Sequence, residues 1–191
     1  YEAQINVTFL GDEQNTILPF YVFNEDSAIS TTNNLELSSL VGYQYGIGGL
    51  KSYSYPASNL ASLTLNVDIP GNTQVMRIKP GSTIMLTIGL QNNGEGVIKK
   101  INDLSIIVPE GFVKTDKCSQ FSQNGNTLVF SGPEPKFDEI KLGGSRYVAS
   151  CQLVNGGTVL IPNKPMKKIF IGHLTYDYLI QKKVVVGLVQ R

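Results

Sequence analysis

The chain carries one histidine, and that residue is the natural place to look for acid–base chemistry. His173 lies in an alternating segment near Tyr176 and Asp177. A serine hydrolase needs a nucleophile beside such an imidazole, commonly in a Gly-x-Ser-x-Gly turn. No such turn occurs in the sequence. Because a lone histidine in a strand is more often structural, we predict no catalytic residues and a protein that is not an enzyme.

The spacing of the cysteine, histidine and acidic residues gives little support to a metal or cofactor site. Two cysteines and one distant histidine do not have the spacing of a zinc ligand set. Acidic pairs occur at Asp12-Glu13, Glu25-Asp26 and Asp138-Glu139, without the spacing of a calcium-binding loop. Two carboxylates facing each other across a cleft would suit a glycosidase, but the sequence does not place these pairs. We therefore predict no cofactor and no metal.

The two cysteines, Cys118 and Cys151, are the only ones in the chain. An even number of cysteines in a chain that looks secreted suggests one disulfide. Its loop of about 33 residues would contribute roughly 3.7 kcal/mol in the chain-entropy model. The alternative is two buried free thiols. We predict the disulfide, because Cys118 lies in a polar stretch where an unpaired thiol would be exposed.

Four tyrosines flank a glycine-rich stretch and form a candidate ligand platform: Tyr43, Tyr45, Tyr53 and Tyr55. Exposed tyrosines stack on sugar rings or anchor protein interfaces, so surface glycans are a candidate partner. The i, i+2 spacing within each pair is equally that of ordinary packing on one face of a strand. Both interpretations stay open at this point.

The N-terminal segment alternates, with Ile5, Val7 and Phe9 as its apolar set. A terminal strand of this kind can complete the sheet of a neighbouring subunit through main-chain hydrogen bonds, so these residues form a candidate intersubunit strand. Asn6 opens an Asn-Val-Thr sequence, which makes it a candidate glycan attachment site.

Composition narrows the class of protein. The chain has 191 residues, of which 16% are charged, and a net charge of +1. Nucleic acid is therefore not an expected partner, because phosphate neutralisation needs clustered Lys and Arg. No run approaches the roughly 18 apolar residues of a membrane span. The first residue is Tyr1, as expected for a chain from which a signal peptide was removed. We expect a secreted or cell-surface protein.

Period-2 alternation recurs along the chain and predicts about eleven strands. Gly, Pro and Asn turns separate them, and Asn124-Gly125 and Asn155-Gly156 predict hairpins over Phe121–Phe130 and Arg146–Ile161. The predicted strands are Gln4–Leu10, Ile17–Phe23, Ser62–Ile69, Gln74–Lys79, Ser82–Asn92, Asp103–Val108, Thr127–Ser131, Arg146–Leu153, Thr158–Ile161, Lys168–Leu179 and Lys183–Val189.

This pattern predicts an all-β fold with little helix: an antiparallel β-sandwich of the immunoglobulin-like or jelly-roll kind. The one helix candidate is Leu35–Val41. We expect a single enlarged sandwich over residues 1–191, because residues 1–70 hold too few strands for a core of their own. The alternative is an N-terminal strand extension over 1–70 beside an immunoglobulin-like domain over 71–191.

Turns and strands over residues 73–191 resemble those of a known family. Pro80-Gly81 precedes an alternating strand, Asn93-Gly94 follows it, and a later strand ends in Pro109-Glu110-Gly111-Phe112. The final segments, Leu174–Tyr178 and Val184–Val186, fit the same pattern. The region resembles the immunoglobulin-like domains of archaeal and bacterial surface proteins, the cell-adhesion-related and surface-layer-associated modules. That resemblance implies scaffolding or adhesion and carries no catalytic residues.

Together these observations lead to an expected function. The chain is predicted to be a structural subunit of an extracellular cell-surface assembly, a filament, pilus or surface layer. Its expected partners are further copies of itself, in a homo-oligomer or polymer joined by exchange of the N-terminal strand. The alternative is a carbohydrate-binding or adhesin module that uses the Tyr43–Tyr55 segment. A secreted hydrolase on a sandwich scaffold is the third hypothesis, supported only by the carboxylates.

Overall fold

The computed structural model describes residues 2–24, 53–56, 63–70, 75–94, 96–132, 145–157 and 166–185. In this part of the chain the fold is all-β, with eleven strands and one 3₁₀ turn, so the predicted all-β class and the strand number are confirmed. The elements are β1 (Glu2–Asn24), β2 (Tyr53–Pro56), β3 (Leu63–Asp68), β4 (Val75–Ile78), β5 (Thr83–Asn92), β6 (Val97–Ile107), β7 (Phe112–Lys114), η2 (Asp116–Cys118), β8 (Phe121–Asn124), β9 (Thr127–Phe130), β10 (Ser145–Asn155) and β11 (Met166–Val185).

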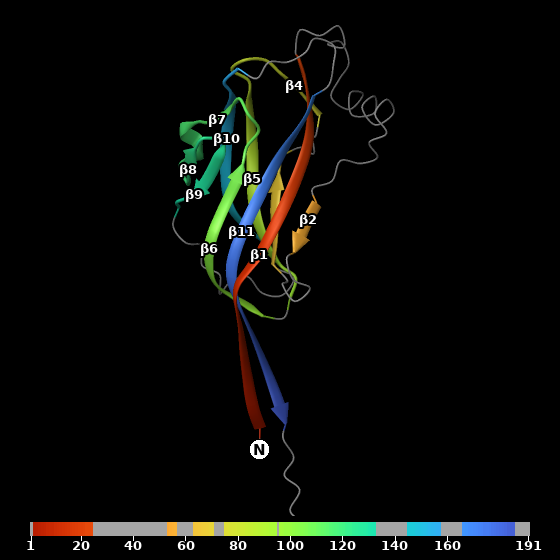
Figure 1. The fold of residues 1–191 in the computed structure, drawn as a ribbon, viewed down its shortest axis with the longest axis vertical. Coiled ribbons are helices and arrows are strands. Elements are labelled where there is room, and N and C mark those ends of the chain that lie inside the picture. Colours follow the sequence, from red (N-terminus) through yellow and green to blue (C-terminus); the bar gives the residue numbers. More distant parts are fainter. Residues whose placement is uncertain are drawn as a thin grey trace, which may run out of the picture.

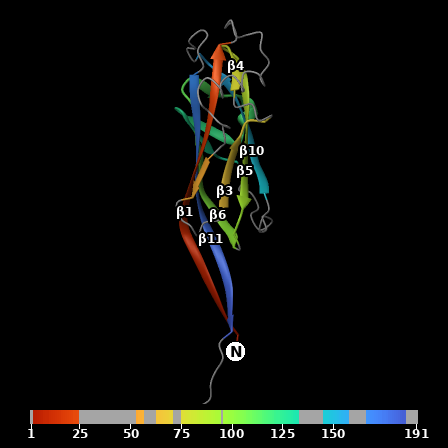
Figure 2. The same cartoon turned by 90° about the vertical axis from the view of Figure 1, so that its right-hand side faces the viewer.

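The strands form two sheets that pack face to face (Figures 1 and 2). The larger sheet has the order β2-β1-β11-β6-β9-β8, and β4 adds to β1 in parallel. The smaller sheet has the order β3-β5-β10-β7. Strands from the first 70 residues thus lie in both sheets, with β1 in the larger and β3 in the smaller.

The core lies between the sheets and follows the predicted alternation. In β3 and β5 the apolar residues are buried while the intervening ones are partly exposed. The larger sheet contributes Phe20 and Phe170, whose rings stack with centroids 4.8 Å apart, and Phe112 lies against both. Gly172 brings β11 close to β3, since a Cβ there would lie 2.9 Å from a Leu65 methyl carbon.

Two polar side chains of β1 are buried in this core. Leu65 N donates a 2.8 Å hydrogen bond to Gln14 Oε1, and Thr16 Oγ1 donates to Leu65 O. Gln14 and Thr16 are each 1% exposed. These bonds satisfy backbone groups on the edge of β3, which has β5 as its only described strand partner in the smaller sheet. They also hold β1 at one register against the opposite sheet.

A second buried network closes the sandwich at the turn between β5 and β6. The Tyr178 hydroxyl donates to Asn92 Oδ1 and accepts from Gly96 N at 2.7 Å. Asn92 Nδ2 in turn donates to Gly96 O. A Cβ on Gly96 would lie 2.5 Å from Leu179 O and 2.6 Å from the Tyr178 ring, so only glycine fits at this position. The turn therefore fixes the point where β11 leaves the sandwich.

The predicted disulfide between Cys118 and Cys151 is present, so that prediction is confirmed. It joins η2 to β10, and both cysteines are fully buried. Cys118 lies in a polar stretch of the sequence that was expected to be exposed, yet its side chain is buried. The burial arises because Thr115 N also donates to Gln152 O, which brings this turn onto β10.

Several predicted elements differ from the observed ones. The segments Gln4–Leu10 and Ile17–Phe23 belong to one strand, β1, because the polar residues between them also pair with β11. The hairpin Phe121–Phe130 is confirmed, with Gly125 at φ 57°. In the hairpin predicted over Arg146–Ile161, only β10 is described. The predicted strand Thr158–Ile161 and helix Leu35–Val41 lie outside the described residues.

Substituting Gly96→Ala is expected to lower the free energy of unfolding by about 1–3 kcal/mol, because the new methyl group must displace a backbone carbonyl and a buried ring. Denaturant unfolding measures the change. Gly156→Ala is the matched control, since a Cβ there meets its nearest neighbours at 3.5 Å; its change should stay within about 0.5 kcal/mol. Equal effects of the two substitutions would contradict this account of the turn.

Replacing both cysteines, Cys118→Ala with Cys151→Ala, should lower the free energy of unfolding by about 2–4 kcal/mol through loss of the cross-link. The measurement is the denaturant midpoint of the variant and of the wild type with and without reductant. Convergence of the reduced wild type on the variant would attribute the loss to the cross-link itself. A variant as stable as the oxidised wild type would show that the bond adds nothing.

Candidate functional site

The most distinctive feature of the fold is a pair of strands that extends beyond the sandwich. The first part of β1 and the last part of β11 continue out of the body as a two-stranded ribbon (Figures 1 and 2). We call the segments 2–9 and 178–185 the ribbon. They pair antiparallel, from Glu2 opposite Val185 to Phe9 opposite Tyr178.

Within the described part of the chain, most of the ribbon has no third strand beside it. The pairing of β6 with β11 ends at Val97 opposite Leu179, and the pairing of β2 with β1 is confined to Gln14–Ile17. About six rows, spanning roughly 20 Å, thus consist of β1 and β11 alone. Two paired strands without further support are marginally stable in water, and their outer edges carry hydrogen-bonding groups suited to another strand.

A register shift marks the root of the ribbon. The pairing of β1 with β11 is interrupted between Phe9 and Asp12 and resumes in the body. Immediately above the shift, Gln14 and Thr16 attach β1 to Leu65. Among the described strands, the part of β1 before the shift pairs with β11 alone, whereas the part after it pairs with β11 and also bonds to Leu65 of the opposite sheet.

The residues predicted for intersubunit contact lie in this ribbon. Ile5, Val7 and Phe9 pair with Lys182, Ile180 and Tyr178 of the same chain. The candidate glycan site Asn6 is opposite Gln181. The N-terminal strand is thus already paired within its own chain, so any exchange with a neighbour must replace these pairings.

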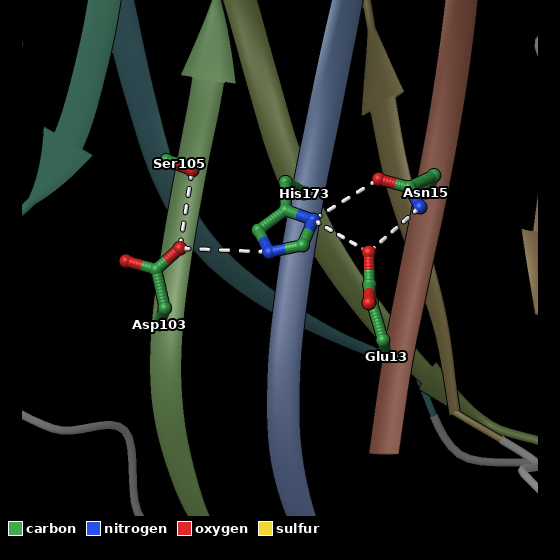
Figure 3. Close-up of polar contacts among 5 residues, drawn as sticks. All are labelled: Glu13, Asn15, Asp103, Ser105 and His173. Atoms are coloured by element: carbon green, nitrogen blue, oxygen red, sulfur yellow. Dashed lines mark hydrogen bonds and ion pairs between the residues drawn. The ribbon is translucent and has the colours of Figure 1, made fainter. Parts of the chain in front are cut away.

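A polar cluster lies just above the register shift, on the outer face of the larger sheet (Figure 3). His173 of β11 stands in one row with Asn15 of β1 and Ser105 of β6. Glu13 and Asp103 flank the imidazole from β1 and β6. Three adjacent strands therefore contribute to the cluster, and all five side chains are at least partly exposed to solvent.

The imidazole has a carboxylate near each ring nitrogen. Nδ1 lies 3.0 Å from Asn15 Oδ1 and 3.4 Å from Glu13 Oε1, while Nε2 lies 4.0 Å from Asp103 Oδ2. Asn15 Nδ2 donates to Glu13 Oε1 at 3.2 Å, so the amide oxygen is the atom that faces the histidine. Nδ1 must then carry a proton, and Nε2 points toward a carboxylate oxygen.

This arrangement differs from a hydrolase triad. Ser105 Oγ donates to Asp103 Oδ2 at 3.2 Å, whereas a triad serine bonds to the histidine. Two residues that lie close to His173 in the sequence have other described contacts or surroundings. Tyr176 is fully buried on the opposite face, and Asp177 accepts a hydrogen bond from Asn102. Glu13 and Asp103 are the partners that sequence reasoning missed, because only strand register brings them to His173.

Half of the tyrosine platform falls in the described residues. Tyr53 and Tyr55 lie in β2, opposite Ile17 and Asn15 of β1. Tyr43 and Tyr45 lie outside the described residues.

Beside the polar cluster runs a row of aliphatic residues on the same face of the sheet. Ile17, Ile171 and Ile107 are opposite one another on β1, β11 and β6. Ile107, Ile169 and Val129 are 44%, 39% and 36% exposed. Grouped apolar side chains on a solvent-facing sheet suit a protein contact.

At the end of β9 a cleft of about 320 Å³ lies beside β6, lined in part by Asp103 and Phe130.

The described residues contain no group of three or more His, Cys, Asp or Glu side chains able to hold a metal ion. No helix among them is long and apolar enough to cross a membrane.

Comparison with known proteins finds no match to this chain among protein-family models, curated proteins or solved structures.

Proposed function

We propose that this protein is a non-catalytic structural subunit of an extracellular cell-surface assembly, and that copies join through the β1–β11 ribbon. The observation that carries the proposal is the ribbon itself: two strands that extend roughly 20 Å past the last neighbouring strand that the structure describes. Strands with open edges are a hazard for a protein that must remain a monomer, and proteins usually shorten or cover them. A long ribbon is useful where strand addition is the means of assembly.

The proposed contact is exchange of the N-terminal segment between copies. Residues 2–9 leave the β11 of their own chain and pair in the same register with the β11 of another chain. The acceptor already binds this sequence within one chain, so a second copy is the partner of matching chemistry. The register shift between Phe9 and Asp12 is the proposed hinge, since it interrupts the ladder and contains Gly11.

Each chain carries one donor segment, residues 2–9, and one acceptor strand, β11. Two kinds of assembly are therefore possible. Reciprocal exchange closes a pair with two-fold symmetry. Exchange from one chain to the next leaves a donor at one end and an acceptor at the other, which yields an open filament. We propose the open form, in line with the resemblance to surface proteins.

Other features support a surface location. The Cys118–Cys151 disulfide is of a kind that persists in oxidising compartments. The aliphatic row at Ile17, Ile171 and Ile107 supplies a second contact surface beside the ribbon.

Deleting residues 1–10 is expected to abolish assembly while leaving a folded, soluble monomer, because the removed segment ends before the Gln14 and Thr16 anchors. Light scattering and negative-stain electron microscopy measure assembly, and circular dichroism checks the fold. Polymers of unchanged length would rule out exchange of this strand.

A reversible lock tests the exchange more directly. Ala3→Cys with Val184→Cys places two thiols at opposite positions of the ribbon, so oxidation joins the donor to its own acceptor. The oxidised variant should remain monomeric, and mild reduction should restore assembly. Wild type carried through the same redox steps is the control for the native disulfide. Assembly of the oxidised variant at the wild-type rate would contradict the mechanism.

A further inference from the structure

We propose that the outer face of the larger sheet binds the same face of a second copy, with the β11 strands of the two copies running in opposite directions. This contact gives the aliphatic row of the proposed function a partner, and it rests on that proposal for its place in an assembly. The contact itself needs no exchange of the N-terminal segment, so the two can be tested apart.

The centre of this face is aliphatic and open to solvent. Ile171 of β11 lies in one row between Ile17 of β1 and Ile107 of β6. Ile107 is 44% exposed, and Ile169, the next residue on the same side of β11, is 39% exposed. Covering these side chains with another apolar surface removes them from water and so favours a contact.

Charges of opposite sign lie at the two ends of the aliphatic centre. Toward the ribbon, Thr175 of β11 lies between Glu13 and Asp103, whose side chains are 47% and 43% exposed (Figure 3). Away from the ribbon, the exposed Lys167 occupies the same side of β11. Lys167 and Thr175 are each four residues from Ile171, which is about 13 Å along a strand. The face is thus acidic at one end, aliphatic in the middle and basic at the other.

Two identical sheet faces can meet in two aligned ways about a two-fold axis. With the β11 strands parallel, Lys167 lies over the partner's Lys167 and the acidic ends also meet, so like charges repel. With the strands antiparallel and the axis at the row of Ile171, Lys167 lies over the row that holds the partner's Glu13 and the partner's Asp103. Equal spacing on either side of Ile171 matches both ends at once, so the charges select the antiparallel pair.

The same pattern makes a second copy the partner of matching chemistry. Beyond the acidic row, Asp177 and Lys100 are opposite each other, so their charges offset and leave the match unchanged. Rows 167–175 across four strands cover roughly 500 Å² on each copy. A standard interface buries about 800 Å² on each side, so the expected pair is weak and dissociates in the micromolar to millimolar range.

The first test measures pairing by sedimentation equilibrium, up to millimolar concentration, in the oxidised Ala3→Cys, Val184→Cys background, where strand exchange is blocked. Lys167→Glu should raise the dissociation constant of the pair about tenfold, because two attractive contacts become repulsive. Lys117→Glu makes the same change of charge on η2, beside the smaller sheet, and should change the constant less than about twofold. A parent chain that stays monomeric throughout, or equal effects of the two substitutions, would overturn the contact.

Mixing two charge-reversed chains tests the orientation. The double variant Glu13→Lys with Asp103→Lys should pair as weakly as Lys167→Glu, since its acidic end has become basic. In an equimolar mixture of the two variants, both contacts of the mixed pair again join opposite charges, so its dissociation constant should return to within about threefold of the parent value. A mixture that pairs no more tightly than either variant alone would overturn the antiparallel arrangement.

Cross-linking decides the orientation without charge reversal. Facing sheets lie about 10 Å apart, too far for a disulfide, so the experiment uses a short reagent that joins two thiols. Lys167→Cys chains mixed with Thr175→Cys chains should give cross-linked pairs, whereas either chain alone should give few. Cys118 and Cys151 are joined to each other and buried, so they do not compete. Cross-links that form only between chains of one kind would indicate the parallel pair and overturn the proposal.

Failure of the face contact is distinguishable from failure of the proposed function. Pairing of the locked chain, without polymers of the unlocked chain, would support the face contact and reject strand exchange. Polymers of the unlocked chain, without pairing of the locked chain, would support strand exchange and reject the face contact.

Discussion

The attachment of β1 to β3 through Gln14 and Thr16 is the interaction on which the other features depend. Both side chains meet the backbone of one residue, Leu65, so a slip of β1 by a single position would break both bonds and reverse every side chain of the strand. Asn15 lies between them and faces outward. The same anchor therefore determines which row of β1 meets His173 and where the ribbon begins.

Local alternation was sufficient to predict most of the core. The segments around β3 and β5 show strict period 2, and the turn at Asn124-Gly125 predicts its own hairpin. The length of β1 was not predictable in this way. Its middle carries Gln14 and Thr16 where alternation leads one to expect apolar residues, and only the edge of β3, a feature of the tertiary fold, makes polar residues suitable there.

The residues of the candidate site likewise differ in whether the sequence alone could predict them. Cys118 and Cys151 were identifiable as a pair because the chain has only two cysteines, and Ile5, Val7 and Phe9 were identifiable as part of a strand because the segment alternates. The cluster around His173 joins residues 13, 103 and 173, whose proximity is set by the register of three strands. Register depends on bulges such as the one between Phe9 and Asp12, and these leave no signal in local hydrophobicity.

The continuity of β1 and β11 from the ribbon into the body has a mechanical consequence. In the proposed assembly, a neighbouring subunit that pulled along the ribbon would apply its force parallel to both strands, so the load would shear the β1–β11 ladder instead of opening it one bond at a time. Shear divides the tension among many hydrogen bonds at once. Inside the body the tension meets the bonds to Leu65 on one strand and the Tyr178 hydroxyl on the other. A chain of such subunits would behave as a tether, stiff under axial load and weakest where each ribbon meets the next.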